Sequence, residues 1–119
     1  MKSYKTPLRY PGGKSRACTK MDPFFPDLRD YKEYREPFLG GGSVAIHITK
    51  KYPHLDIWVN DLYEPLYNFW RVLQDDGRVL YERLQDLKST HPDEESARKL
   101  FLESKDIVNA YTESNLSRA

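Results

Sequence analysis

The sequence predicts an α/β fold built around one βαβ unit of a parallel sheet. A short extended run at 34–39 and a run rich in aromatic and β-branched residues at 55–59 flank a glycine triplet and an apolar stretch with helical spacing. Parallel strands need a crossover connection, and a helix is the usual one. From Glu64 onward the apolar residues recur at helical spacing, so the second half is predicted to be helical.

The individual elements are predicted from their start and stop signals. Residues 7–16 are rich in proline and glycine and predict a loop, followed by a short helix through about Met21 that Pro23 ends. Ser43 is the expected cap of a helix over residues 44–52, because its hydroxyl can accept a backbone N–H of the first turn. Gly77 is expected to divide the next helical stretch.

A third helix is expected to follow these two, with Pro92 and the acidic residues behind it in its first turn. Two parallel strands do not complete the doubly covered sheet to which such strands belong. The sequence therefore predicts a truncated α/β domain followed by helices.

Composition limits the classes of function. The net charge is +1, so any contact with a nucleic acid must come from a local basic patch. Cys18 is the only cysteine, which excludes an internal disulfide and fits a reducing compartment. The three histidines lack ligand-like spacing, and we expect no metal site. Neither a signal peptide nor a membrane span is evident, so we expect a cytoplasmic chain without a membrane partner.

The glycine triplet Gly40-Gly41-Gly42 follows the first predicted strand and precedes a helix. Glycines there let the backbone turn tightly and approach a ligand closely. Asp61 follows the second predicted strand, where a carboxylate can accept hydrogen bonds from ribose hydroxyls. This layout indicates a cofactor that contains a nucleoside.

Two cofactor classes share the layout. The spacing of Gly40, Gly42 and Ala45 also fits a nicotinamide or flavin enzyme. Glu36 precedes the glycines, and a carboxylate is poorly placed beside a pyrophosphate but suits the positive methionine end of S-adenosylmethionine. We favour the latter. A turn and a helix cap without any ligand remain a third interpretation.

Three motifs taken together resemble a known family. The motifs are Leu8-Arg9-Tyr10-Pro11-Gly12-Gly13-Lys14, Glu36-Pro37-Phe38-Leu39-Gly40-Gly41-Gly42-Ser43-Val44 and Asn60-Asp61-Leu62. In order and spacing they resemble the first three motifs of Dam-type adenine-specific DNA methyltransferases. The resemblance implies a Rossmann-like methyltransferase fold, with residues 1–75 binding S-adenosylmethionine and residues 76–119 beginning a helical target-recognition region. The implied cofactor contacts are Tyr10, Lys14, Glu36, Phe38, Gly40, Gly42 and Asp61.

The sequence departs from this family in one respect. Members carry an Asp-Pro-Pro-Tyr motif that polarises the exocyclic amine of a flipped adenine, and these 119 residues do not contain it. Asp22-Pro23-Phe24-Phe25 is a poor substitute, because it precedes the first strand. We therefore expect no catalytic residue here and no activity of the chain alone, whether it is completed by another polypeptide or is a non-catalytic binding remnant.

The resemblance also implies double-stranded DNA as the partner. Arg9, Arg16 and Lys20 form a small basic group near the proposed cofactor site, where they could meet phosphates beside a flipped base. An ordinary solvated helix face explains the same residues equally well. The recognition sequence does not follow from these residues.

Overall fold

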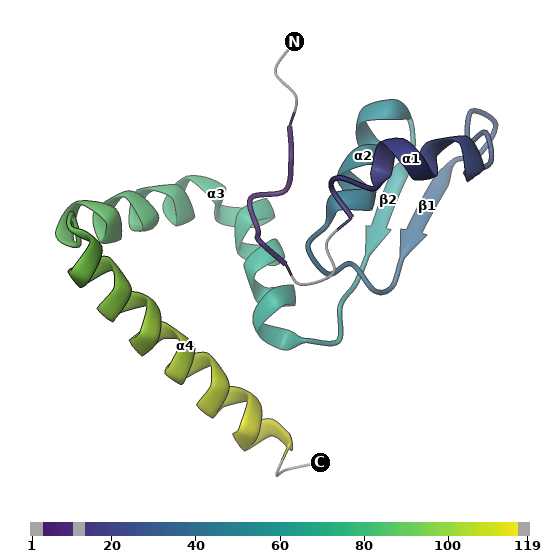
Figure 1. Ribbon diagram of the computed structural model, residues 1–119. Coiled ribbons are helices and arrows are strands. Elements are labelled where there is room, and N and C mark those ends of the chain that lie inside the picture. Colours follow the sequence, from purple (N-terminus) through teal and green to yellow (C-terminus); the bar gives the residue numbers. More distant parts are fainter. Residues whose placement is uncertain (1–3, 11–13, 117–119) are drawn as a thin grey trace. The chain divides into compact units, whose positions relative to one another are not determined.

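The computed structural model describes residues 4–10 and 14–116, and the chain divides into two compact units, Met1–Tyr67 and Asn68–Ala119 (Figure 1). Pro11, Gly12 and Gly13 of the first motif lie outside the described residues. The predicted boundary near residue 75 separates two functions, a cofactor-binding part and a recognition region. The boundary between the two compact units lies at residue 67.

The first unit contains the predicted βαβ arrangement. Strands β1 (Glu33–Glu36) and β2 (Asp56–Val59) are parallel, with Tyr34 opposite Ile57, and helix α2 (Ser43–Lys51) connects them (Figure 1). β1 ends earlier than predicted, because Pro37 has no N–H to donate to the ladder. The pairing resumes beyond it, where Leu39 N donates to the Asn60 carbonyl over 2.9 Å.

The core of this unit lies between α2 and one face of the sheet. Its buried members are Ile48, Tyr52 and Leu55, and the partly buried residues packed against them are Phe25, Leu28, Tyr34, Val44 and Ile57. Tyr34 and Ile57 are register partners, so both point to the same face of the sheet. Trp58 points to the opposite face and is 51% exposed. Among the described residues, only one face of the sheet is therefore well covered.

Helix α1 (Cys18–Met21) is short and ends at Met21, as predicted, and it continues into a 3-10 turn, η1 (Asp22–Phe24). The carbonyl of Lys14 accepts the N–H groups of Ala17 and Cys18, so the chain turns before the helix begins. Pro23 stands at the start of η1, where its missing N–H is not needed. Cys18 is buried beneath this segment, and burial raises the pKa of its thiol.

The second unit is helical, as predicted. Helix α3 (Glu64–Thr90) enters it from the first unit and bends at Asp76, whose φ of −137° and ψ of 41° are not helical, next to the predicted break at Gly77. Helix α4 (Glu94–Leu116) begins after Asp93, whose carboxylate accepts the Ser96 N–H over 2.8 Å. Pro92 therefore lies before the helix rather than in its first turn. Over residues 4–10 and 14–116, no helix combines the length and the apolar character needed to cross a membrane.

Candidate functional site

The glycine turn joins the carboxyl end of β1 to the start of α2. Gly40 has a φ of 55° and Gly42 a φ of 75°, a region that side chains disfavour. Gly42 is also the N-cap of α2, and no side chain caps the helix. The prediction that Ser43 caps it was wrong, because Ser43 is already the first helical residue. Its hydroxyl instead forms a 2.8 Å hydrogen bond with that of Ser15.

Asp61 ties the end of β2 to this turn. Its Oδ2 accepts the Gly40 N–H over 2.9 Å, and its Oδ1 accepts the Tyr63 N–H over 3.0 Å. Asp61 is not the N-cap of α3, since the Tyr63 carbonyl accepts the first helical bond from Tyr67. A carboxylate has about four acceptor positions, so two remain for other donors. Asp61 therefore shapes the turn while retaining the capacity to accept hydroxyl groups.

A segment from the N-terminus lies against the other side of the turn. A Cβ on Gly41 would stand 2.8 Å from Tyr10 Cβ, and one on Gly40 would stand 3.1 Å from Tyr10 Cε1. Thr6 Oγ1 donates a hydrogen bond to the Gly41 carbonyl, and the same hydroxyl accepts the Leu8 N–H over 3.2 Å. The contact of Tyr10 with the glycines joins two of the predicted motifs. Sequence reasoning missed Thr6, because its partner is 35 positions away.

We expect Gly41→Ala to reduce the free energy of unfolding by about 1–3 kcal/mol, because its new Cβ would overlap a backbone-proximal atom of Tyr10. Tyr10→Gly removes that atom and should recover most of the loss, as measured by urea denaturation of the single and double variants. Gly77→Ala is the matched control, since its Cβ would meet nothing nearer than 3.9 Å. Equal losses from Gly41→Ala in both backgrounds would contradict the contact.

Glu36 ends β1 on the face of the sheet that packs on α2. Burial raises the pKa of this carboxyl, although the Tyr34 hydroxyl donates to Glu36 Oε2 over 3.3 Å and a backbone hydrogen bond from Ala45 also favours the ionised form. Burial and the neighbouring carboxylate together raise the pKa of Tyr34 to about 12. A partly desolvated carboxylate of this kind interacts strongly with a cationic group brought beside it.

The remaining predicted cofactor contacts, Lys14 and Phe38, have exposed side chains. Phe38 is 85% exposed. The Lys14 side chain is exposed as well, and within the described residues its ammonium makes no ion pair. Their proposed roles thus depend on a ligand rather than on contacts within the protein.

Two of the three predicted DNA-binding residues lie together. Arg9 and Arg16 line one hollow of about 510 Å³, together with Tyr10, Ser15 and Ser43. Lys20 is exposed on α1 and is not among the described residues that line this hollow. The structure thus groups the two arginines beside the tyrosine of the first motif.

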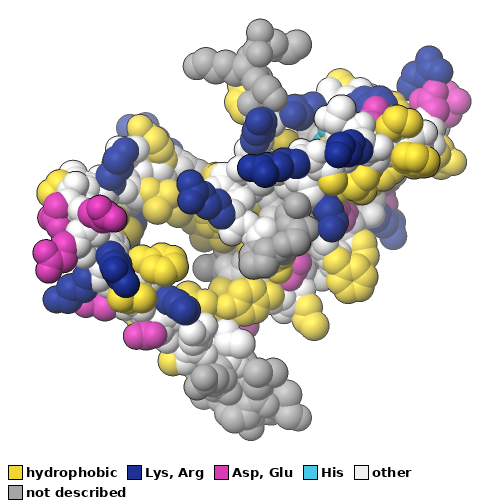
Figure 2. All heavy atoms as spheres, in the orientation of Figure 1, with side chains coloured by type: hydrophobic (Ala, Val, Ile, Leu, Met, Phe, Trp, Pro, Cys, Tyr) yellow, Lys and Arg dark blue, Asp and Glu magenta, His cyan; other side chains and the backbone are white. Residues whose placement is uncertain are grey.

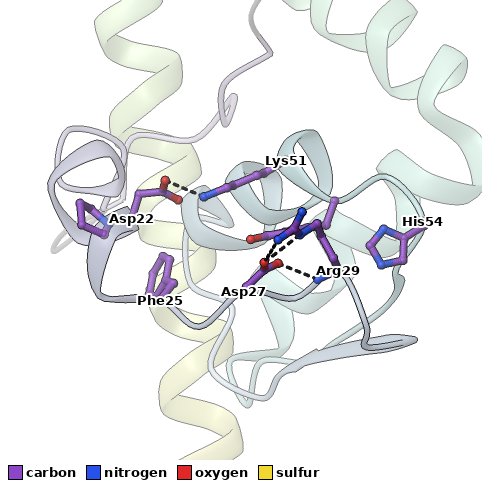
Figure 3. A pocket seen from close by; sticks show the side chains of 8 residues that line it. Asp22, Phe25, Asp27, Arg29, Lys51 and His54 are labelled. Atoms are coloured by element: carbon purple, nitrogen blue, oxygen red, sulfur yellow. Dashed lines mark hydrogen bonds and ion pairs between the residues drawn. The ribbon is translucent and has the colours of Figure 1, made fainter.

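A second hollow, of about 580 Å³, lies away from the glycine turn. It is lined by η1, the loop after it and the carboxyl end of α2, which is about 13 Å from the amino end at 1.5 Å per residue. Its charges are paired: Lys51 Nζ lies 2.7 Å from Asp22 Oδ2, and Arg29 Nη2 lies 2.6 Å from Asp27 Oδ2 (Figure 3). Gly40, Gly42 and Asp61 are not among the described residues that line this hollow, and we do not assign the cofactor to it.

Comparisons with known proteins point to one family. The sequence model of the D12 class N6 adenine-specific DNA methyltransferases matches residues 10–118. The chain is also similar to the type II methyltransferase M.MjaIII of Methanocaldococcus jannaschii, with 29% identity over 107 residues. That alignment covers 86% of this chain and 37% of the relative, so the chain spans little more than a third of the relative's length.

Proposed function

We propose, from the premise that this chain belongs to the D12 class N6 adenine-specific DNA methyltransferase family, that residues 1–75 bind S-adenosylmethionine for methyl transfer to N6 of adenine in DNA. The proposal includes a Rossmann-like arrangement, of which β1, α2 and β2 form one unit. Residues 76–119 are proposed to begin the helical region that recognises the target.

One observation carries this proposal: Asp61 Oδ2 accepts the Gly40 N–H, which joins the ends of both strands at one edge of the sheet. Ligands of open α/β sheets bind outside the carboxyl ends of the strands. The acceptor positions left on Asp61 suit the two hydroxyls of a ribose. Glu36, at the end of the neighbouring strand, suits the positively charged methionine part, with Gly40 and Gly42 allowing close approach.

The proposed roles of the other residues follow from their positions. Tyr10 packs on the turn and would bound the cofactor on that side, while Lys14 and Phe38 are exposed and would approach a bound cofactor. Arg9, Arg16 and Lys20 are proposed to contact DNA phosphates. S-adenosylmethionine supplies an electrophilic methyl group. The residues of this chain bind and orient that reagent and do not activate the adenine.

Activation of the adenine is assigned to residues outside this sequence. The 119 residues contain no Asp-Pro-Pro-Tyr motif. Their alignment with the similar methyltransferase covers 37% of that protein. We therefore propose that a polypeptide segment carrying that motif completes the enzyme, and that the 119-residue chain does not methylate DNA by itself.

Calorimetric titration of the chain with S-adenosylmethionine tests the proposal. We expect saturable binding at one site and, in a parallel thermal melt, stabilisation of about 2.7 kcal/mol at a ligand concentration of one hundred times Kd. NAD is the control ligand, since it shares the adenosine but brings a pyrophosphate next to Glu36. Circular dichroism establishes that the chain is folded. A folded chain that binds NAD in preference to S-adenosylmethionine would contradict the proposal.

A further inference from the structure

Two adjoining hollows in the first unit share Thr6, Ser15 and Ser43 in their walls. One is the hollow of Arg9 and Arg16, and the other, about 220 Å³, extends along α2. Their described walls contain four lysine or arginine residues and no aspartate or glutamate. These four, which we call the basic track, are Lys5, Arg9, Arg16 and Lys50.

One side of α2 forms the wall of the smaller hollow. This side has the residue spacing of one helix face and consists of Ser43, Ile46, His47 and Lys50. Ala45 and Ile48 of the same helix are buried. The Ser15–Ser43 hydrogen bond joins this face to the segment before α1. At the other end, Lys50 Nζ donates to the Tyr4 carbonyl over 2.9 Å. Because an ammonium has three donors, Lys50 keeps two for a ligand.

Within residues 4–10 and 14–116, no ion pair neutralises the charge of the basic track. Its four cations form no ion pair with any described residue. By contrast, Lys51 and Arg29 in the hollow of about 580 Å³ do form ion pairs. Among the described residues, Glu36 lies near Cys18 in the wall of the smaller hollow, and Asp22 lies behind His47. Asp22 Oδ1 lies 2.9 Å from His47 Nε2, and Asp22 Oδ2 is paired with Lys51. Figure 2 shows dark blue side chains gathered over the N-terminal segment and α1.

We propose that the two hollows bind consecutive phosphates of one DNA strand, with the basic track as the counter-charge. One O–H of the Ser15–Ser43 pair is used between the two hydroxyls, and the other is a further donor to a phosphate. Arginine, lysine and serine are among the side chains that contact DNA phosphates, and such contacts position a protein on DNA without reading its sequence. The proposal rests on the proposed function and extends it to Lys5, Lys50, Ser15 and Ser43. It places the DNA backbone along the N-terminal segment and α2.

The salt dependence of DNA binding tests the basic track. We would titrate the 119-residue chain into a fluorescein-labelled 16-base-pair duplex and measure anisotropy at several salt concentrations. Each phosphate contact contributes about 0.9 to the slope of log K against log salt concentration. Arg16→Gln and Lys50→Gln should each weaken binding and lower that slope by about one, equally for duplexes of unrelated sequence.

Lys32→Gln is the matched control, because it removes the same charge from the first unit outside both hollows. It should leave the slope unchanged. A slope lowered equally by Lys32→Gln, or unchanged in Lys50→Gln, would overturn the proposal, as would absence of duplex binding by the folded chain. Displacement of the duplex by millimolar inorganic phosphate at constant ionic strength would also overturn it in favour of a site for a single small anion.

Titration of the same preparations with S-adenosylmethionine separates this proposal from the preceding one. Arg16→Gln and Lys50→Gln should bind the cofactor as the unaltered chain does. Loss of cofactor binding together with DNA binding would show that the variants disturb the fold, and Lys50→Arg then decides the matter. This variant keeps the charge and should restore both the affinity for DNA and the slope, whereas failure to restore them would count against the track.

Discussion

Replacement of Asp61 by alanine is expected to weaken S-adenosylmethionine binding by about 10- to 100-fold, since hydrogen bonds to a charged group contribute about 1.5–3 kcal/mol. The variant removes the acceptor proposed for the ribose hydroxyls and also frees the Gly40 and Tyr63 N–H groups. Calorimetric titration of folded protein measures the loss.

Two further variants distinguish the ligand contact from a distorted turn. Asp61→Asn keeps one side-chain carbonyl for Gly40 or Tyr63 but loses the charge, and we expect an intermediate affinity. Asp56→Ala removes a carboxylate from the opposite end of β2 and should leave affinity unchanged. Unaltered binding by a folded Asp61→Ala variant would refute the assignment of Asp61 to the cofactor.

The second large effect concerns stability. Ile48→Ala is expected to lower the free energy of unfolding by about 2–5 kcal/mol, the range for deleting a fully buried branched side chain. Ile48 is 2% exposed and packs with Tyr52 and Leu55 at the centre of the core. Because it holds α2 against the sheet, its loss should also disturb the glycine turn at the amino end of that helix.

Chemical denaturation followed by circular dichroism measures this effect, and Ile46→Ala provides the control. Ile46 belongs to the same helix but lines the hollow of Lys50 instead of the core, so its removal should cost less. Equal losses from the two substitutions would indicate that α2 is not anchored to the sheet through Ile48.

The local elements of this protein could be read from its sequence. A short extended run before the glycine triplet predicted β1, and a β-branched and aromatic run predicted β2. The glycine triplet predicted the turn between β1 and α2, and helical spacing predicted α3 and α4 with a break next to Asp76. These features are determined within a few residues, by dihedral preferences and by the period of the apolar positions. The same rules placed Ser43 as a cap, wrongly, because the positive φ of Gly42 lets the helix begin without one.

Other features were decided only by the tertiary structure. The hydrogen bond from Thr6 to Gly41, the contact of Tyr10 with the turn and the pairing of Ser15 with Ser43 join residues separated by roughly thirty positions. No local pattern encodes such pairs, because they form only after α1 and the N-terminal segment pack beside α2. By itself, the sequence determined the βαβ unit and the family motifs. Packing decided which side chains surround the turn, and it left the cations of the basic track without an ion pair to any acid in the described part of the chain.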